Sequence, residues 1–387
     1  MESTLGSIFR RHFADYAQRH KQPLYVHRAA YWLANCRTQA MGGHLNRCPE
    51  GHVEHASYNS CHQRYCPQCQ GLATERWLQA QKSRLLNCAH HHLIFTIPHE
   101  FNPLWMFNRA AMARLLFAAV RDTLSELLAD PKYLGATPAF LLALHTWGRS
   151  LVLHPHIHAL VADGGLDAAS RWILPGRSHF LPARVVMLLF RGKFIAAVRR
   201  AIESSQLRIP PNPGQTRYTS LLNKLARVKW NVRLCTRYAH GAGVTAYLAR
   251  YVRGGALKNS QIVSANSKQI IFRYRPHRDE ADTDCGPQLM RLAPDDFLTR
   301  YLAHLPPPGL QTLRAYGLYA NTQRALLDQA RQPLGQAPVE MPEPITPQRF
   351  LARFTHTRSR THCPRCGHAL ICVPLQNHAT GPPSRPH

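Results

Sequence analysis

The segment LVLHPHIHALVA at residues 151–162 places three histidines at alternate positions, with apolar residues between them. Side chains of a β-strand alternate between its two faces, so His154, His156 and His158 share one face while Ile157 lies on the other. The apolar face can anchor the strand in a core, and the opposite face then presents imidazoles at close spacing. The segment therefore predicts a strand with polar chemistry on one side of its sheet.

The histidine face is interpreted as a metal site. Imidazole binds divalent metal ions and titrates near neutral pH. The alternative is a polar strand face on which each histidine bonds only to a neighbour or to solvent, and for a single histidine that alternative would be preferred. The repeated alternation between apolar residues favours a metal site built on His156 and His158.

The charge balance indicates a polyanionic partner. The chain has 48 Lys and Arg against 21 acidic residues, a formal net charge of +27 with histidine neutral. Residues 182–240 hold twelve Lys or Arg and one acid, and their cations are interleaved with Phe194 and Trp230. Counterion release from phosphates favours binding to such a surface. We expect DNA as the partner, with Lys193 and Lys229 among its contacts, although a basic surface can also serve solubility alone.

No membrane partner is expected. The apolar runs of the sequence are much shorter than the roughly 18 residues of a membrane-spanning helix. The N-terminal residues MESTLGSIFRRHFADY mix charged and apolar side chains, so no secretory signal is evident. The sequence therefore predicts a cytoplasmic protein.

The eleven cysteines favour metal binding over disulfides in a cytoplasmic chain. Five of them lie in the segment of residues 36–70. Cys66 and Cys69 form a CxxC knuckle, whose two-residue spacer lets both thiolates face one tetrahedral ion. We expect Cys48 and His52 to complete a structural zinc site with this pair, and the zinc to fold a small basic module that contacts DNA. A set of buried free cysteines is the alternative.

Further candidate ligands lie in the same segment and in the tail. The following residues remain for a second site or for substitution in the first: Cys36, His44, His55 and Cys61. The tail reads CPRCGHALIC at residues 363–372. Cys363 and Cys366 form its CxxC, and His368 and Cys372 are candidate partners for a zinc ion there.

The segment GVTAYLARYVRGG, residues 243–255, places Tyr247 and Tyr251 four residues apart, on one face of an expected helix. A tyrosine hydroxyl attacks a phosphodiester when a metal polarises the phosphate and a cation offsets the developing charge. A packing pair is the ordinary alternative at this spacing. Beside a histidine metal site and a basic surface, we interpret the tyrosines as nucleophiles and the adjacent Arg250 and Arg253 as DNA contacts.

Apolar periodicity supplies the expected elements around these motifs. A second basic helix is expected before residue 243. Helices are also expected near residues 71–88, 104–130 and 183–206, and strands near residues 91–100, 139–149, 151–162 and 269–278.

Taken in order, the motifs resemble the two-tyrosine HUH transposases of the insertion sequence ninety-one type. The resemblance is carried by HPHIH, by the YxxxY pair about ninety residues downstream and by the N-terminal NSC…CPxCQ segment. It extends through HLIFTIPHE, LHTWGRSLVLHPHIHALV, RGKF, YLARY and LRAYGLYAN, over roughly residues 30–325.

The resemblance implies a role for each motif. His156 and His158 would bind Mg²⁺ or Mn²⁺ with a third ligand on an adjacent strand, and His154 would be a neighbour of the site. Tyr247 and Tyr251 would each form a 5′-phosphotyrosyl bond with single-stranded DNA and leave a free 3′-OH. The implied activity is rolling-circle transposition of an insertion sequence at the bacterial nucleoid.

The fold class expected from these features is α+β. We expect an HUH-endonuclease-like antiparallel sheet covered by helices, an N-terminal zinc-binding module and a small C-terminal zinc-ribbon-like tail. The expected divisions are a helical and zinc-binding domain at 1–88, a catalytic domain at 89–305, and a Pro-rich linker with the CxxC tail at 306–387. Three alternatives stay open: a plasmid-type replication initiator or relaxase, a non-catalytic zinc-bearing DNA-binding regulator, and an inactive copy of the transposase.

Overall fold

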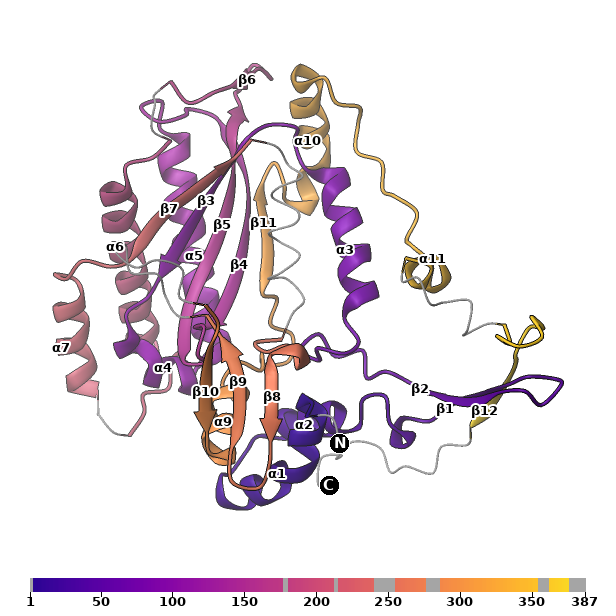
Figure 1. Ribbon diagram of the computed structural model, residues 1–387. Helices are drawn as coiled ribbons and strands as arrows, with labels where there is room; N and C mark the ends of the chain where they lie inside the picture. Colours follow the sequence, from indigo (N-terminus) through magenta and orange to yellow (C-terminus); the bar gives the residue numbers. More distant parts are fainter. Residues whose placement is uncertain are drawn as a thin grey trace.

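The centre of the fold is an antiparallel sheet with the strand order β11-β4-β5-β3-β7, and β6 pairs with the end of β5 (Figure 1). The computed structural model describes residues 3–176, 180–211, 215–239, 255–275, 286–353 and 362–375. The strands of this sheet are β3 (His90–Thr96), β4 (Thr137–Trp147), β5 (Leu153–Leu166), β6 (Trp172–Ile173), β7 (Val232–Tyr238) and β11 (Leu313–Gly317). The expected α+β class, with an antiparallel sheet and covering helices, is confirmed.

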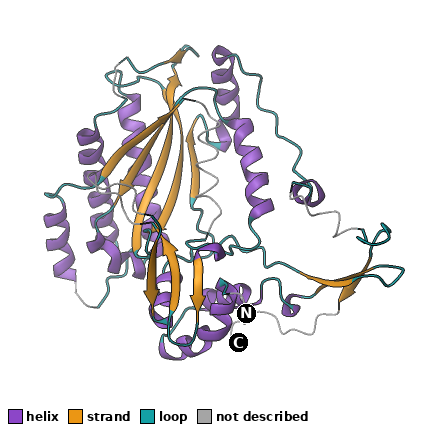
Figure 2. Cartoon of the chain, viewed as in Figure 1, coloured by secondary structure: helices purple, strands orange, loops and turns teal. Residues whose placement is uncertain are grey.

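Helices α5 (Arg109–Ala129) and α6 (Ala183–Glu203) cover one face of this sheet, with α4 (Asn102–Phe107) and α7 (Gln215–Leu225) beside them (Figures 1 and 2). Alternate strand residues point into this core because the side chains of a strand alternate in direction. Ile157 is one of them and is completely buried. No helix within the described ranges is both long and apolar enough to cross a membrane.

The opposite face is apolar at one end and carries the histidines further along the same strands. At the apolar end, Leu141 and Leu160 pack against Tyr319 and Leu327, in a cluster that also includes side chains beside α3 (Gly71–Arg84) and on α10 (Arg324–Arg331). This cluster fixes the sheet from its second side. Both faces of the central strands are therefore held in place, which gives the histidine face a rigid support.

A second core joins the N-terminal helices to a segment far along the chain. Helices α1 (Leu5–Arg19) and α2 (Leu24–Asn35) pack with α9 (Pro294–Leu302), and Phe9 meets Tyr301 edge to face at 5.7 Å. The same core includes residues of a three-stranded sheet made of β8 (Ile262–Ala265), β9 (Ile270–Tyr274) and β10 (Gln288–Leu292). This packing crosses the expected division between residues 88 and 89.

Over its described residues, the C-terminal tail contributes its strand to a sheet of the N-terminal segment. Its strand β12 (Ile371–Leu375) pairs with β1 (Gly43–Arg47), which pairs in turn with β2 (Glu54–Tyr58). Figure 1 shows this three-stranded ribbon projecting from one end of the molecule. The two zinc-like segments of the sequence therefore belong to one small sheet.

The Pro-rich segment before the tail packs against the protein, although a linker was expected there. Val339 and Ile345 are buried, and the backbone of Val339 donates a hydrogen bond to Asp328 over 2.7 Å. Arg76 on α3 donates to the Ile345 carbonyl over 2.9 Å. The short helix α11 (Pro347–Leu351) continues along the same path.

The expected second basic helix is wrong over its C-terminal half. Helix α7 ends at Leu225, and the basic stretch that follows is strand β7, which pairs with β3. Strand β7 carries a register shift opposite His91 and Leu93, so that Arg237 pairs with His91 and Arg233 with Ile94. This interruption obscures the period-two pattern by which a strand is recognised in a sequence.

We predict that Gly317→Ala destabilises the fold far more than Gly335→Ala. Both glycines have a positive φ, 57° and 66°, but a Cβ at Gly317 would overlap the carbonyl oxygen of Pro138, whereas Gly335 faces open space. Strain and overlap together should cost about 2–5 kcal/mol at Gly317, against about 1 kcal/mol at Gly335. Thermal unfolding measures the difference, and equal losses would show that β11 tolerates a shift away from β4.

Candidate functional site

Three histidines meet on the face of the central sheet opposite the α5–α6 core. His145 lies on β4, His156 and His158 lie on β5, and the ligand nitrogens of the three all lie within 4.8 Å of one another. His145 stands directly opposite His156 in the strand register. It therefore occupies the adjacent-strand position at which a third ligand was expected but not assigned.

A β-bulge in the β4–β5 hairpin produces this arrangement. Trp147 pairs with Leu153, whereas His145 pairs with His156, so β5 holds one more residue than β4 between these two pairs. Without the extra residue, His145 would share a face with Pro155 instead of His156. Proline has no amide hydrogen and is common at bulges, which suits Pro155 to this position.

Hydrogen bonds orient the imidazoles. Nδ1 of His156 donates to the carbonyl oxygen of His154 over 2.7 Å, so the neutral ring carries its free lone pair on Nε2. That Nε2 lies 3.1 Å from Nε2 of His158. Nδ1 of His158 lies 2.9 Å from Nε2 of His92 on β3. His92 thus supports His158 from a third strand, as outer partners commonly orient metal ligands.

Burial keeps these rings neutral at neutral pH. It lowers the pKa of His156 and of His92 to about 4 each. Burial, followed by the neighbouring imidazoles, also strongly lowers the pKa of His158. Neutral imidazoles offer lone pairs to a cation instead of repelling it. The three converging nitrogens fit a divalent ion, and because Mg²⁺ prefers oxygen ligands, Mn²⁺ suits this donor set better.

Other residues predicted for this site have different positions. The ring of His154 lies 5.1 Å from that of His156, outside the group of three. The two tyrosines and two arginines predicted within residues 243–255 lie outside the described residues. They are Tyr247, Arg250, Tyr251 and Arg253.

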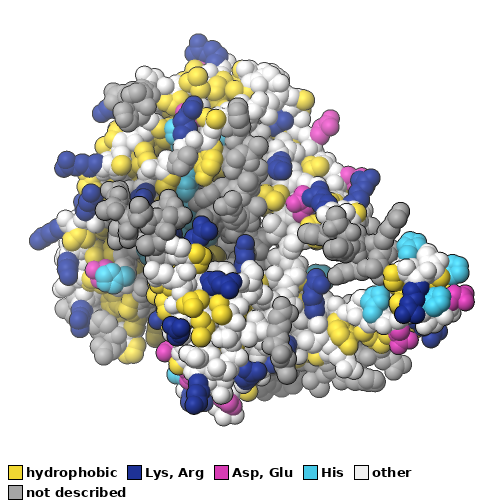
Figure 3. Space-filling view, in the orientation of Figure 1, with side chains coloured by type: hydrophobic (Ala, Val, Ile, Leu, Met, Phe, Trp, Pro, Cys, Tyr) yellow, Lys and Arg dark blue, Asp and Glu magenta, His cyan; other side chains and the backbone are white. Residues whose placement is uncertain are grey.

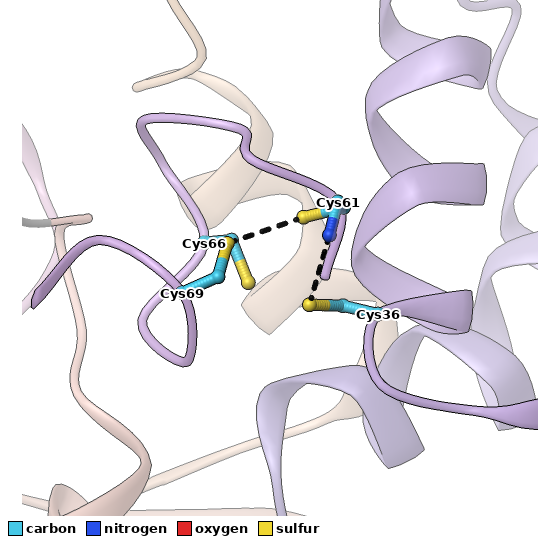
Figure 4. Close-up of side chains that lie close together, drawn as sticks. All are labelled: Cys36, Cys61, Cys66 and Cys69. Atoms are coloured by element: carbon cyan, nitrogen blue, oxygen red, sulfur yellow. Dashed lines mark hydrogen bonds between the residues drawn. The ribbon is translucent and has the colours of Figure 1, made fainter. Parts of the chain in front are cut away.

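Four cysteines near the N-terminus form a separate cluster (Figure 4). Cys36 follows α2, and its sulfur lies 3.5 Å from the backbone nitrogen of Cys61. The sulfur of Cys61 lies 3.6 Å from that of Cys69, and Cys66 completes the group. Hydrogen bonds from the other thiols hold the pKa of Cys36 far below its usual range. Four sulfurs at this spacing fit a tetrahedral zinc ion.

This grouping corrects the expected zinc ligands. Cys48 and His52 do not join Cys66 and Cys69, whose partners are instead Cys36 and Cys61. A CxxC motif shows that its two cysteines share an ion, but the spacing of the remaining ligands does not identify the second pair.

Cys48 and His52 lie with the tail residues Cys363 and Cys366. The other candidates lie apart from both groups in the structure. His44 and His55 project from β1 and β2, Cys372 is exposed on β12, and His368 lies 3.9 Å from the carboxylate of Glu50.

Two of the basic residues singled out in the sequence, Lys193 and Lys229, lie on the helical side of the sheet. Lys193 on α6 pairs with Glu126 over 2.6 Å, and Lys229 is exposed in the loop before β7. Phe194 and Trp230 are buried in the α5–α6 core, so they are packing residues and cannot stack on bases. Figure 3 shows Lys and Arg dispersed over the drawn face, with few acidic side chains.

A basic hollow of about 660 Å³ lies between α3 and the edge strand β11. Arg84 and Trp77 line it from the α3 side, Arg314 and Tyr316 from β11, and Arg121 from α5. Arg64 also borders it and donates to the Thr312 hydroxyl over 2.7 Å. Strand β11 pairs with β4, the strand of His145. Because its residues come from four distant segments, no local sequence pattern indicates this hollow.

Comparison with known proteins gives two family matches. Residues 139–325 match the family described as "Putative transposase". Residues 8–97 match the family described as "Transposase zinc-binding domain". The first range contains the three histidines, and the second contains the four-cysteine cluster.

Two relatives are similar over much of their length. A protein of Sinorhizobium fredii named "Putative transposase y4qJ" is 31% identical over 389 residues, covering 98% of this chain and 97% of the relative. The "Transposase for insertion sequence element IS801" of Pseudomonas savastanoi pv. phaseolicola is 30% identical over 293 residues, 74% of this chain and 68% of the relative. A solved structure of TrwC with a 27-mer DNA covers 42% of this chain and 72% of its own, at 11% identity and a TM-score of 0.23, too low to support a conclusion.

Proposed function

Because the chain belongs to the insertion-sequence transposases of the insertion sequence ninety-one type, with their N-terminal zinc-binding domain, we propose that it cleaves and rejoins single-stranded DNA through 5′-phosphotyrosine intermediates. This reaction would drive rolling-circle movement of its element at the bacterial nucleoid. The observation that supports it most is the group formed by His145, His156 and His158, a set of imidazole ligands on a rigid sheet within the matched transposase region.

In the proposed step, a phenol oxygen of Tyr247 or Tyr251 bonds to phosphorus while the bond from phosphorus to the 3′ oxygen breaks. The phenol loses its proton, and the departing 3′ oxygen gains one to become a free hydroxyl. The phosphotyrosyl ester retains the energy of the broken bond, so rejoining needs no nucleotide cofactor. A divalent cation bound by the three histidines would supply polarisation of the scissile phosphate.

The histidine cluster would act as a preformed cation site. His92 takes no part in the bond changes in this proposal; it holds the ring of His158 at the angle the site requires. The sheet cores on both faces keep the strands from moving apart, so ordering the ligands costs little when the ion binds.

We further propose that the hollow between α3 and β11 receives the single strand. Arginines at Arg64, Arg84, Arg121 and Arg314 supply positive charge along it, and Trp77 with Tyr316 adds aromatic side chains. Grooves that bind single strands combine these two features, because cations follow the backbone and aromatic rings stack on bases. The edge strand β11 of the hollow pairs with β4, the strand of His145. The hollow and the histidine group therefore lie on neighbouring parts of the sheet.

An oligonucleotide cleavage assay tests the reaction. Single strands carrying the ends of the element should form a denaturant-resistant protein adduct at the 5′ end in the presence of Mn²⁺ and not in chelator. Changing both Tyr247→Phe and Tyr251→Phe, or His156→Ala alone, should abolish the adduct. Tyr274→Phe, which removes a hydroxyl bonded to Gln288 on a different sheet, should retain it. An adduct that survives the double tyrosine change would refute the proposed nucleophiles.

We predict that His92→Ala raises the Mn²⁺ concentration for half-maximal cleavage by about 10–100-fold, because His158 loses its orienting partner. Cleavage at saturating Mn²⁺ should recover most of its rate. His90→Ala is the matched control, because His90 is a buried histidine of the same strand face that bonds Tyr319 over 2.7 Å instead. An equal Mn²⁺ shift in both variants would attribute the effect to loss of packing.

For the hollow, we predict that Arg84→Gln combined with Arg121→Gln weakens single-strand binding and flattens its salt dependence. Each lost phosphate contact should reduce the slope of log affinity against log salt by about 0.7. The control pair is Lys268→Gln with Arg291→Gln, two exposed cations of the separate β8–β10 sheet, which should leave the slope unchanged. Fluorescence anisotropy over a salt series measures both. Equal losses would indicate diffuse electrostatic attraction without a defined path.

A further inference from the structure

The second ligand cluster joins parts of the chain that are more than three hundred residues apart. Cys48 and His52 flank the turn between β1 and β2, whereas Cys363 and Cys366 precede β12. In each turn a glycine amide donates to the carbonyl of the preceding ligand cysteine, from three residues further along at Gly51 and from four residues further along at Gly367. The backbone nitrogen of Gly51 bonds the Cys48 carbonyl at 3.0 Å, and that of Gly367 bonds the Cys363 carbonyl at 2.9 Å.

These turns resemble metal knuckles in detail. Each follows a Cys-Pro pair, and each places its glycine at a positive φ, 70° at Gly51 and 75° at Gly367. The backbone nitrogen of Arg365 lies 3.4 Å from the Cys363 sulfur, the contact by which knuckles support a thiolate. Glycine at these positions lets the chain reverse tightly, so that the ligands of both turns face the same point.

The distances within the cluster match a tetrahedral zinc ion. With Zn–S near 2.3 Å and Zn–N near 2.0 Å, tetrahedral geometry requires sulfurs about 3.8 Å apart and sulfur–nitrogen distances of about 3.5 Å. The sulfurs of Cys48 and Cys366 are 3.4 Å apart. Nδ1 of His52 lies 3.8 Å from the Cys48 sulfur and 3.9 Å from the Cys363 sulfur.

We propose that Cys48, His52, Cys363 and Cys366 bind a second structural zinc ion, which fastens the C-terminal tail to the N-terminal ribbon. The matched zinc-binding family ends at residue 97 and the transposase family at residue 325, so neither includes the tail ligands. The site is separate from the four-cysteine cluster and independent of the proposed DNA cleavage.

The path of the chain into the site supports this assignment. The segment before the tail runs along α3, where Arg76 bonds the Ile345 carbonyl over 2.9 Å and Arg353 pairs with Glu75 over 2.7 Å. Strand β12 then pairs with β1 over five residues, from Arg47↔Ile371 to Gly43↔Leu375. The ligands are thus brought together by contacts on both sides of the site.

The ion would have an effect beyond the ribbon. Helix α3, which the C-terminal segment contacts, also carries Trp77 and Arg84 of the basic hollow. Zinc binding would hold that segment against α3 and so stabilise one wall of the hollow. Closing a loop of this length costs conformational entropy that the metal–ligand bonds would offset.

The test counts zinc in the full-length protein by elemental analysis. The parent should hold about two ions per chain, and Cys363→Ser with Cys366→Ser should hold about one. Cys61→Ser should lose the other ion. Cys372→Ser is the matched control, because Cys372 is an exposed tail cysteine on β12, outside the cluster, and this variant should retain two ions. Cys363→His keeps a zinc-binding side chain and should therefore restore the second ion. That result would show that the serine variant does not lose its zinc ion through misfolding.

Thiol alkylation gives an independent measurement. Cys363 should be protected from alkylation in the zinc-loaded protein and become reactive on chelation, under reducing conditions throughout. Two ions retained in the double serine variant would overturn the proposal. The proposal would also be overturned if Cys48 and Cys366 formed a disulfide in the parent protein and if opening that disulfide with a reductant released no metal.

Discussion

The pairing of β4 with β5 is the interaction on which the functional side of this protein depends. Its bulge at Pro155 shifts the register by one residue, and only with that shift does His145 face His156. The cores on the two faces of the sheet then stabilise a hairpin whose strands are already in the required register. The packing of Ile157 on one face and Leu160 on the other opposes a slip, because a slip by one residue would turn His156 and His158 into the apolar α5–α6 core.

The elements with strong periodicity could be predicted from the sequence. The alternation around His156 and His158 gave the strand, its buried face and two members of the histidine group. The third, His145, could not be predicted, because an unbulged hairpin from the same turn would place it on the other face of the sheet. Similarly, His92 bonds His158 through a strand pairing that no local pattern encodes. The local sequence determines which side chains lie on each face of a strand. The pairing of strands determines which residues those side chains meet.

The zinc ligands show the same limit over a longer range. The Cys66–Cys69 pair was recognisable as a knuckle from its spacing, but its partners Cys36 and Cys61 were not distinguishable from Cys48 and His52 by any local rule. The partners of Cys48 lie beyond residue 360, and no spacing motif links ligands that are so far apart in the sequence. Charge counts misled in a related way, because Trp230 stands among exposed cations and is nevertheless buried.

The return of the tail to the ribbon has a consequence for synthesis. Domains commonly begin to fold from the N-terminus as the chain leaves the ribosome. Here β1 can pair with β2 early, but its other edge finds its partner only after Leu375 has emerged. The β1–β2 hairpin must therefore wait, with one edge unpaired, until translation has produced the long stretch of chain between Tyr58 and Ile371, and a message cut short within that stretch would leave the edge open to neighbouring chains.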